Sequence, residues 1–353
     1  MNNFHYQDTI ESRCIFGNEA REDVVLTIVV PTYKRTELLE KTLNSILNQR
    51  PIKSMSYQVI IVSNDPEYSR DRIGLDLDDK IFSVYKNNEN LDMVGNMNRC
   101  ALIAKGKYIA YVQDDDILLD NYLVEIEKLF TNGILDTIDC LIPNRYFYYD
   151  INTDGTFGLQ AYSKEQKKSA LKRIVSVGKK KKLLQRVDAD DCGNTWYNCF
   201  AGGPTCGMLF KREALLNSEG FSYDFKYAFD YVFFIDFSRN NNVVLYDNYL
   251  SVYRMNDSAS NRPDVQKDFF DSDMYLLDKL KNTNEFVKKY VDEIIRFSYE
   301  NKSKEAQLLI RKDFPVYKNN LKYCMFRIVR LVRLLRDNLY RREIMPSEYK
   351  KLL

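Results

Sequence analysis

Apolar, β-branched runs alternate with helical patterns through the first part of the chain, and this alternation restricts the fold more than any other feature. Strands are expected at 24–30, 57–63, 81–85, 108–112 and 137–142. Between several of these runs, apolar residues recur at helical spacing, with Thr36 and Asp92 placed to cap two helices. Such a series predicts an α/β fold with a doubly wound, mostly parallel sheet and helices on both faces.

Three consecutive carboxylates, Asp114, Asp115 and Asp116, directly follow the expected strand at 108–112. Adjacent like charges repel one another and resist desolvation, so something should compensate them. A hard divalent cation does so, and Mg²⁺ binds through one or two carboxylates plus substrate phosphates. The place also fits, because open α/β sheets bind ligands beyond the carboxyl ends of their strands. The alternative is a solvated acidic turn that caps a helix starting near Leu118.

Composition excludes several classes of protein. The chain has 353 residues and a formal net charge of +2, which argues against general nucleic-acid binding. Its single histidine, His5, lies in a polar leader, which excludes a Ser-His-Asp triad, a Cys-His pair and a His-ligated metal. Seven cysteines without a C-x-x-C pair fit a reduced protein better than a disulfide framework. With no apolar membrane span and no signal peptide recognised, we expect a cytoplasmic location.

The pattern divides the chain into three parts. Residues 1–23 are polar and are expected as an extension that is docked late or left loose, and 24–262 form the main domain, with halves 24–142 and 143–262. Residues 263–353 are helical and charged. Within the second half, 164–186 contains ten basic residues and is either a solvated lid or a flap that attracts phosphate.

Four segments resemble, in order, the inverting nucleotide-sugar glycosyltransferases of family two, which have the GT-A fold. They are VVPTYKR at 29–35, VIIVSND at 59–65, NLDMVGNMNR at 90–99 and KGKYIAYVQDDDIL at 105–118. The resemblance covers roughly residues 24–260, and similar patterns are typical of enzymes that build bacterial surface polysaccharides. It implies a GT-A-like sheet and a nucleotide-sugar donor.

The resemblance also implies which residues hold the donor nucleotide. These are Pro31, Thr32, Tyr33, Arg35, Asn64, Asp65, Asn96 and Arg99. Tyr33 can stack on a base and Arg35 can pair with phosphate, whereas Asn64 and Asp65 sit where the family reads the pyrimidine edge. Five of them also have a purely structural interpretation: a helix-start surface charge for Arg35, turn formers for Asn64 and Asp65, and exposed helix residues for Asn96 and Arg99.

The acidic triplet corresponds to the D-x-D element of the family. By resemblance, Asp114 reaches the ribose or the sugar, and Asp116 or Asp115 binds Mn²⁺ or Mg²⁺. The metal would bridge the two phosphates and stabilise the departing nucleoside diphosphate. Gln113 stands where many relatives have a further acid or a histidine, so the pair of oxygens that binds metal stays open.

Asp230 matches the position of the family's general base, although Phe229 replaces the usual first acid of the pair. An aspartate among aromatic residues should have a raised pKa, which suits proton abstraction. The alternatives are that Asp230 caps a helix or pairs with a lysine, with Asp224 and Asp236 as further candidates for the base.

Two later segments also match the family. Arg254 and Ser258 resemble an element that lies near the phosphates, with Asn256 in place of its histidine. Gly202, Gly203 and Pro204 fall where relatives shape the acceptor pocket.

Residues 326–342 form a basic amphipathic pattern near the C-terminus. Its apolar face has Met325, Ile328, Val329, Leu331, Val332, Leu335 and Leu339, and its basic face Arg327, Arg330, Arg333 and Arg341. Such a helix either lies on an anionic membrane or packs on the catalytic domain with a solvated arginine face.

The resemblance as a whole implies a metal-dependent inverting enzyme. It would move a hexose or N-acetylhexosamine from a nucleotide-sugar, most simply a UDP-sugar, to a hydroxyl of a glycan or lipid-linked acceptor. Its location would be cytoplasmic, with peripheral contact to an anionic membrane as an open alternative, and no nucleic acid is expected as a partner. A non-catalytic member of a polysaccharide-assembly complex is the rival hypothesis. A sugar nucleotidyltransferase is disfavoured, since no Gly-rich loop follows the first strand.

Overall fold

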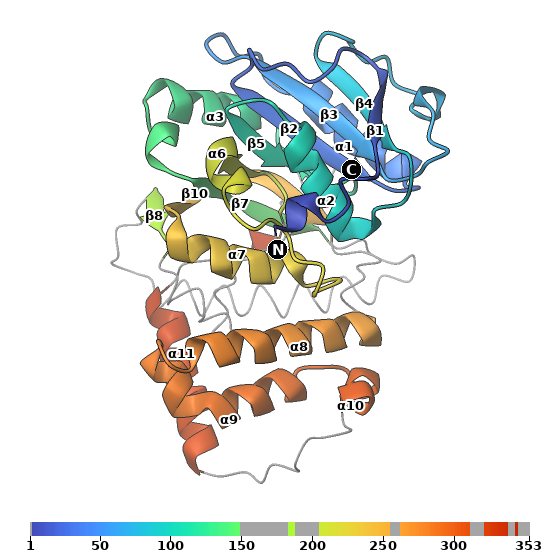
Figure 1. The fold of residues 1–353 in the computed structure, drawn as a ribbon. Helices are drawn as coiled ribbons and strands as arrows, with labels where there is room; N and C mark the ends of the chain where they lie inside the picture. The colour runs from blue at the N-terminus through green and yellow to red at the C-terminus, as the bar shows by residue number, and fades with distance from the viewer. Residues whose placement is uncertain are drawn as a thin grey trace, which may run out of the picture.

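One mixed sheet with helices on both faces forms the body of the molecule, and further helices extend from one side of it (Figure 1). The computed structural model describes residues 2–148, 183–187, 205–254, 262–310, 321–337 and 343–344. The expected α/β architecture, with helices on both faces of the sheet, is confirmed. None of the helices in these ranges has the length and apolar character needed to cross a membrane.

The first half of the sheet is parallel, as predicted. Its strands are β2 (Leu26–Thr32), β3 (Tyr57–Ser63), β4 (Phe82–Asn87) and β5 (Tyr108–Tyr111). They lie in the order β4-β3-β2-β5, so the chain adds two strands on one side of β2 and then crosses to the other side. The gap between β2 and β5 is therefore the topological switch point, where open sheets of this kind bind ligands.

The second half of the sheet is mixed, which corrects the expectation of a mostly parallel arrangement. Its strands are β7 (Cys140–Tyr148), β9 (Met208–Lys211), β10 (Val243–Arg254), β6 (Ile117–Leu118), β8 (Leu184–Arg186) and β11 (Glu343–Ile344). Strand β9 runs antiparallel to both β5 and β7, whereas β7 and β10 are parallel. The direction of β9 separates the two parallel groups.

Strand alternation sends apolar side chains to both faces of the sheet, as a doubly wound fold requires. On one face they pack against α1 (Thr36–Leu47) and α3 (Tyr122–Thr131), and on the other against α2 (Asp92–Ile103) and α7 (Phe229–Asn240). Short helical turns complete these layers at Asn3–His5, Arg70–Arg72, Leu135–Thr137 and Arg212–Leu216 (α6). The capping prediction was wrong by one residue, because Thr36 and Asp92 are the first helical residues and the cap positions are Arg35 and Leu91.

The N-terminal segment is docked on the body rather than loose. Strand β1 (Ser12–Phe16) pairs antiparallel with β4 at the edge of the sheet. Phe4 is buried in the core, and the N–H of Asn3 donates to the carbonyl of Glu219 at 2.9 Å.

The C-terminal helices share the core of the sheet. They are α8 (Pro263–Leu280), α9 (Glu285–Glu300), α10 (Lys304–Ile310) and α11 (Leu321–Asp337). Helix α7 lies between the sheet and α8, with α9 beyond (Figure 1). Apolar residues of α7, α8, α9 and α11 belong to one continuous cluster with those of β5 and β9, so the core does not end at residue 263.

Helix α11 has one packed and one exposed apolar side among the residues whose side chains are described. Phe326 is fully buried against Phe286, Tyr290 and Phe297, whereas Met325 and Ile328 are exposed. Leu339 and Arg341 of the expected amphipathic pattern, and residues 164–182 of the basic segment, lie outside the described residues.

Candidate functional site

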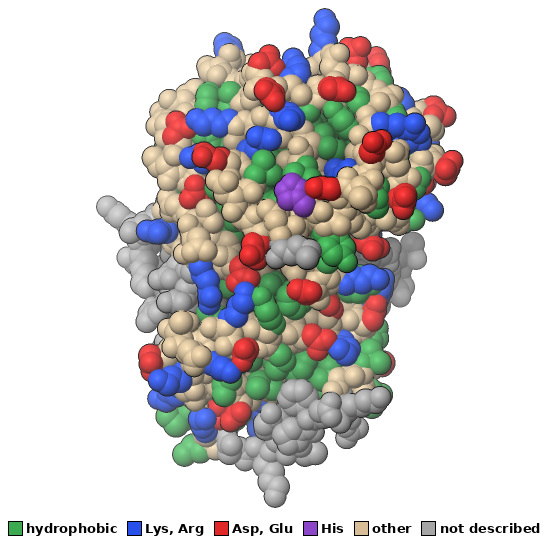
Figure 2. All heavy atoms as spheres, viewed as in Figure 1, with side chains coloured by type: hydrophobic (Ala, Val, Ile, Leu, Met, Phe, Trp, Pro, Cys, Tyr) green, Lys and Arg blue, Asp and Glu red, His purple; other side chains and the backbone are tan. Residues whose placement is uncertain are grey.

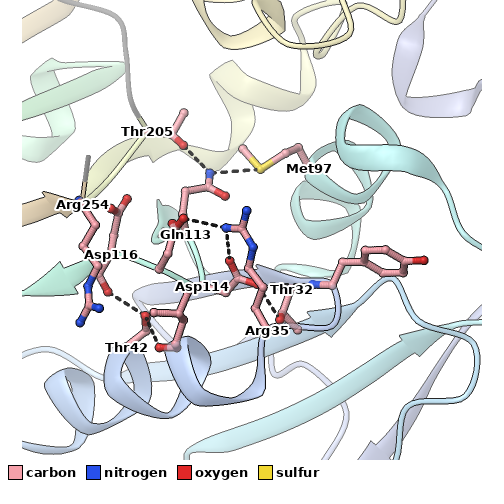
Figure 3. Close-up of polar contacts among 12 residues, drawn as sticks. Thr32, Arg35, Thr42, Met97, Gln113, Asp114, Asp116, Thr205 and Arg254 are labelled. Atoms are coloured by element: carbon pink, nitrogen blue, oxygen red, sulfur yellow. Dashed lines mark hydrogen bonds and ion pairs between the residues drawn. The ribbon is translucent and has the colours of Figure 1, made fainter. Parts of the chain in front are cut away.

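The carboxyl ends of β2 and β5 bring two predicted motifs together at the switch point. The two strands pair in parallel with Val29 opposite Tyr111, and the N–H of Val112 donates to the carbonyl of Val29 at 3.0 Å. The TYKR turn after β2 and the acidic triplet after β5 must therefore leave the sheet side by side. Figure 3 shows Thr32 and Arg35 directed toward the acidic loop.

Asp114 is tied to the turn after β2. Its Oδ2 accepts hydrogen bonds from Thr32 Oγ1 at 2.8 Å and from the N–H of Tyr33 at 3.4 Å. Burial raises the pKa of Asp114 to about 6, and repulsion from Asp115 adds to the rise, although Thr32 and Arg35 oppose it. Asp114 is thus a buried, oriented carboxyl and not part of a solvated turn.

Arg35 spans two of the three acids. Its Nη1 lies 2.7 Å from Asp115 Oδ2 and 3.4 Å from Asp114 Oδ1. Burial alone would lower the pKa of Arg35, but the two carboxylates outweigh it and raise the value. The guanidinium is half exposed, so an incoming phosphate could compete for it. Beside it, Tyr33 is 43% exposed, with the ammonium of Lys34 lying over its ring at 5.1 Å from the ring centre, while Pro31 is buried within β2.

Asp116 is completely buried behind the other two acids. Its Oδ1 accepts a hydrogen bond from the N–H of Arg254 at 3.2 Å, and its backbone carbonyl accepts one from Thr42 Oγ1 at 2.7 Å. Within the described part of the chain, Oδ2 has no hydrogen-bond partner. Burial raises the pKa of Asp116 well above its ordinary value and Asp115 raises it further, whereas the N–H of Arg254, the thiol of Cys206 and the charge of Arg145 lower it. An ionised carboxylate at this depth is costly, and a bound cation would stabilise it.

Arg254 has buried hydrogen-bond donors that lack an acceptor in the described part of the chain. Its Nε and Nη2 atoms are buried and have no partner among the residues that the structure describes. Its backbone places it against Asp116, at the end of β10 (Figure 3). Guanidinium donors of this kind bind phosphate oxygens well. Ser258 and Asn256 of the same sequence element lie outside the described residues, as do Gly202, Gly203 and Pro204.

The described side chains around Asp116 can bind a divalent cation only together with the phosphate oxygens of a bound substrate. No three His, Cys, Asp or Glu side chains in the described ranges converge on one point. Asp116 nevertheless presents an unpartnered buried oxygen, and Mg²⁺ and Mn²⁺ accept one or two carboxylates plus phosphate oxygens. His5, the only histidine, is exposed on the face seen in Figure 2 and pairs with Asp8, so imidazole plays no part in the site.

Asp230 lies at the N-terminal end of α7 and is half-buried among aromatic residues. Its Oδ1 accepts a hydrogen bond from the N–H of Tyr231 at 2.8 Å. Burial raises the pKa of Asp230 to about 6, whereas backbone N–H groups and the positive charge of Arg145 lower it. Among the described side chains no lysine pairs with Asp230, which disfavours one of its structural interpretations. Asp236, by contrast, pairs with Lys279 at 2.8 Å.

Asp224 is a weaker candidate for the base than Asp230. Its carboxylate is exposed and accepts a hydrogen bond from Ser222 Oγ at 3.1 Å. Asp230, by contrast, is partly buried, and burial raises its pKa.

Arg145 is a functional candidate that the sequence analysis missed. It lies in β7 opposite Ser251 of β10 and is the largest fully buried side chain among the described residues. Its charge lowers the pKa of both Asp116 and Asp230, so one buried cation acts on the candidate metal ligand and on the candidate base. An arginine between Asn144 and Tyr146, inside an otherwise largely apolar strand, was the available signal, since such a charge is rarely buried without a role.

The amide of Asn64 is used inside the protein. Its Oδ1 accepts the N–H of Leu91 at 2.8 Å, and its Nδ2 donates to Asn90 and to the backbone carbonyl of Asp92. These bonds hold the loop that precedes α2. The Asn64 side chain therefore shapes the end of β3 from within.

Asp65 is an ion-paired, buried carboxylate at the same strand end. Its Oδ2 lies 2.7 Å from Arg72 Nη1, and its Oδ1 accepts the N–H of Glu67 at 3.1 Å. Burial would raise its pKa, but the hydrogen bond from Arg72 outweighs this and lowers it. Asp65 and Arg72 thus form a fixed pair at the end of β3, which β2 separates from the strand that leads into the acidic triplet.

The structure does not bring Asn96 and Arg99 to the acids. Asn96 is buried and donates to the carbonyl of Val62 at 3.1 Å. Arg99 donates to Ser12 Oγ at 2.7 Å and to the carbonyl of Gln7 at 3.0 Å, so it holds the N-terminal segment on α2. Sequence spacing could not reveal this, because the partners lie almost ninety positions away.

Comparison with known proteins adds a family match. The model of the family described as Glycosyl transferase family 2 matches residues 27–215, more than half of the chain. An uncharacterized glycosyltransferase of Mycoplasma genitalium is 29% identical over 118 residues, which are 32% of this chain and 39% of that protein.

Solved structures share the fold. The structure of S. aureus TarS superposes with a TM-score of 0.51 at 14% identity, covering 93% of this chain and 50% of TarS. TarS 1–349 in complex with UDP-GlcNAc gives a TM-score of 0.50 at 15% identity, covering 90% of this chain and 84% of that one. The chain thus spans half of the longer TarS structure and less than half of the mycoplasma relative. At these identities the likeness to TarS concerns the fold alone.

Proposed function

The chain belongs to glycosyl transferase family 2, and from this premise we propose that it is a metal-dependent, inverting transferase that uses a UDP-sugar. One observation carries the proposal most strongly. At the switch point, the buried Oδ2 of Asp116 lacks a partner in the described chain, and so do two buried guanidinium nitrogens of the adjacent Arg254. A cation bound to a diphosphate satisfies both groups at once, because the cation binds the carboxylate and the phosphate oxygens accept from the arginine.

Asp116 would hold the cation, with Asp115 as a second ligand if Arg35 releases it. The candidate ions are Mn²⁺ and Mg²⁺, which prefer oxygen ligands of this type. When bound, such an ion supplies positive charge that stabilises the diphosphate leaving group. Arg254 would donate to the same phosphate oxygens, and the half-exposed Arg35 could turn toward them from Asp115.

The nucleoside would occupy the region above the carboxyl ends of β2 and β3. Tyr33 has an exposed ring for stacking, and Asp114, held by Thr32, can accept a hydroxyl of the ribose or sugar. Asn64 and Asp65 line this edge of the sheet, where their fixed side chains would shape the base pocket. UDP-GlcNAc is the first donor to test, since TarS 1–349 binds it with the same fold.

Asp230 would act as the general base. Its pKa of about 6 leaves it ionised at neutral pH yet basic enough to take a proton from an acceptor hydroxyl. The hydroxyl oxygen then forms a bond to the anomeric carbon as the bond to the diphosphate oxygen breaks on the opposite face. This single displacement inverts the anomeric configuration, and no protein acid is needed for the leaving group.

The proposed acceptor is a hydroxyl of a glycan or of a lipid-linked sugar, in capsule or cell-wall polysaccharide synthesis. This choice rests on the resemblance of the sequence motifs to enzymes that build bacterial surface polysaccharides. The exposed Met325 and Ile328, beside Arg327 on α11, favour a peripheral contact with an anionic membrane for such an acceptor. A transferase of this kind would work at the cytoplasmic face of the membrane.

A donor panel tests the proposal. Release of nucleotide from UDP-GlcNAc, UDP-glucose, a dTDP-sugar and GDP-mannose would be measured with Mn²⁺ and with EDTA. We expect metal-dependent release from at least one UDP-sugar, and Asp116→Asn should abolish it while Asp120→Asn, at an exposed position paired with Arg50, should not. Binding of these nucleotides without any turnover would favour the non-catalytic alternative instead.

A further inference from the structure

Helix α7, which carries Asp230, begins without a capping side chain of its own. Its cap position is Ala228, and no side chain at that position accepts an N–H of the first turn. The first N–H groups of a helix have no partner within the helix and need one from elsewhere. A carboxylate is the best partner there, because it also interacts favourably with the helix dipole.

Asp268 of α8 places a carboxylate at the two residues just before the first turn of α7. Its Oδ2 accepts hydrogen bonds from the N–H of Tyr227 at 2.8 Å and of Ala228 at 2.9 Å. One oxygen thus holds the two residues that lead into α7, only two positions before Asp230. The sequence analysis found no chemistry beyond residue 262, because the partner of Asp268 is a backbone 40 positions away.

Two further contacts fasten α8 along α7. The hydroxyl of Tyr231 donates to Asp273 Oδ1 at 3.0 Å in a buried position, and Lys279 pairs with Asp236, five residues farther along α7, at 2.8 Å. Figure 1 shows α8 running beneath α7. Residues on both sides of Asp230, namely Ala228 and Tyr231, are therefore anchored to α8.

We propose that Asp268 is a positioning residue, which fixes the start of α7 so that Asp230 is held at the acceptor hydroxyl. This inference rests on the proposed role of Asp230 as the base. Catalytic geometry is sensitive to such anchoring, since a displacement of about 1 Å can lower a rate about a hundredfold. The N-terminal turn of a helix is also where fraying begins, so the loss of the two hydrogen bonds to Asp268 should act there first.

The test compares three variants of the full-length protein. Asp268→Ala removes both acceptor bonds, and Asp268→Asn keeps an oxygen that can accept them. Asp271→Ala is the matched control, because Asp271 lies on the same helix but is exposed and contacts Lys267. Hydrogen exchange of the amides at 225–232 reports on the helix start without requiring activity. Release of UDP from UDP-GlcNAc with Mn²⁺ gives kcat and KM.

In Asp268→Ala we expect exchange at 225–232 to rise about tenfold or more and kcat to fall about tenfold, with KM for the donor unchanged. Asp268→Asn should recover most of both, and Asp271→Ala should match the wild type. Unchanged exchange in Asp268→Ala, or raised exchange with unchanged kcat, would overturn the positioning role. If Asp230→Asn kept full turnover, the base itself and the proposed mechanism would fail, whereas loss in Asp230→Asn with no effect of Asp268→Ala would remove the positioning role alone.

Discussion

At the scale of single residues, the site combines carboxyl groups in three different environments. Asp115 pairs with the half-exposed Arg35, Asp116 is fully buried beside Arg254, and Asp230 lies among aromatic side chains. Burial is the main cause of the raised pKa of both Asp116 and Asp230. Their surroundings nevertheless differ: Asp116, beside Arg254, suits the binding of a cation, whereas Asp230 suits the uptake of a proton.

The first prediction concerns Asp230. Because the base must be ionised, kcat of the wild type should be high above about pH 6 and fall as the pH drops below it. In Asp230→Asn we expect turnover about a hundred- to ten-thousand-fold lower and unchanged UDP affinity. Asn keeps an oxygen for the N–H of Tyr231, so the fold should survive. A variant with wild-type turnover and the same acidic limb would remove Asp230 from the mechanism.

The second prediction concerns Asp116 and stability. Its raised pKa means that the ionised form is disfavoured in the folded state, a cost that grows as the pH rises above the unfolded value of about 4. At neutral pH without metal, the free energy of unfolding of Asp116→Asn should therefore exceed that of the wild type by on the order of 1 kcal/mol, and the variant should unfold at a higher temperature. Near pH 4 the two proteins should differ little. Mn²⁺ with UDP should stabilise only the wild type. A variant less stable than the wild type at neutral pH would indicate that the carboxylate is already compensated.

At the scale of helices and strands, local pattern was enough for most of the first half. The runs at 57–63 and 108–112 are β3 and β5 within one residue, since buried parallel strands are short continuous apolar segments. Strand β1 was missed because Ser12–Phe16 is an edge strand with a mixed sequence. The direction of β9 could not be predicted, because no local signal states which strand a segment will pair with.

The roles of polar residues on these elements were harder to predict than the elements themselves. Thr32, Arg35 and the acids were found because they follow strands directly, and the strand order then brings them together. Asn96 and Arg99 were assigned by position in a motif, but their side chains bind Val62 and the N-terminal segment. Such contacts depend on tertiary neighbours that a single sequence does not reveal.

Arg99 gives the third prediction. Arg99→Ala removes two hydrogen bonds from a partly buried guanidinium and should free β1 and the segment before it. We expect a loss of about 1–3 kcal/mol in stability with UDP affinity unchanged within about twofold. Denaturant unfolding and calorimetry measure the two quantities, with the exposed Arg50→Ala as the control. A tenfold loss of UDP affinity at unchanged stability would return Arg99 to the nucleotide site.

At the scale of the whole molecule, the C-terminal helices form part of the core around α7, the helix that carries Asp230. Eight residues of the twelve in α7 are buried, because the sheet covers one side and α8 and α9 the other. Phe225 packs on Tyr275 at 5.0 Å between ring centres, and Tyr231 binds Asp273. A helix apolar on most sides can be stable in water only if both of its neighbours are present.

The fourth prediction follows for truncation. A chain ending at residue 262 should lack cooperative unfolding and should aggregate, because it exposes the apolar side of α7. Near-ultraviolet circular dichroism and thermal unfolding, beside the full chain, would show this. A soluble 1–262 fragment that unfolds cooperatively and binds UDP like the full chain would instead make 263–353 an independent unit.

The central claim is that buried acids at the switch point hold a cation that binds the donor diphosphate. Calorimetric titration of UDP into the full-length protein, once with Mn²⁺ and once with EDTA, tests it most directly. We predict that Mn²⁺ tightens UDP binding at least about tenfold, which corresponds to about 1.4 kcal/mol. Equal UDP affinity with and without metal would contradict the assignment of Asp116 and Asp115 to a cation.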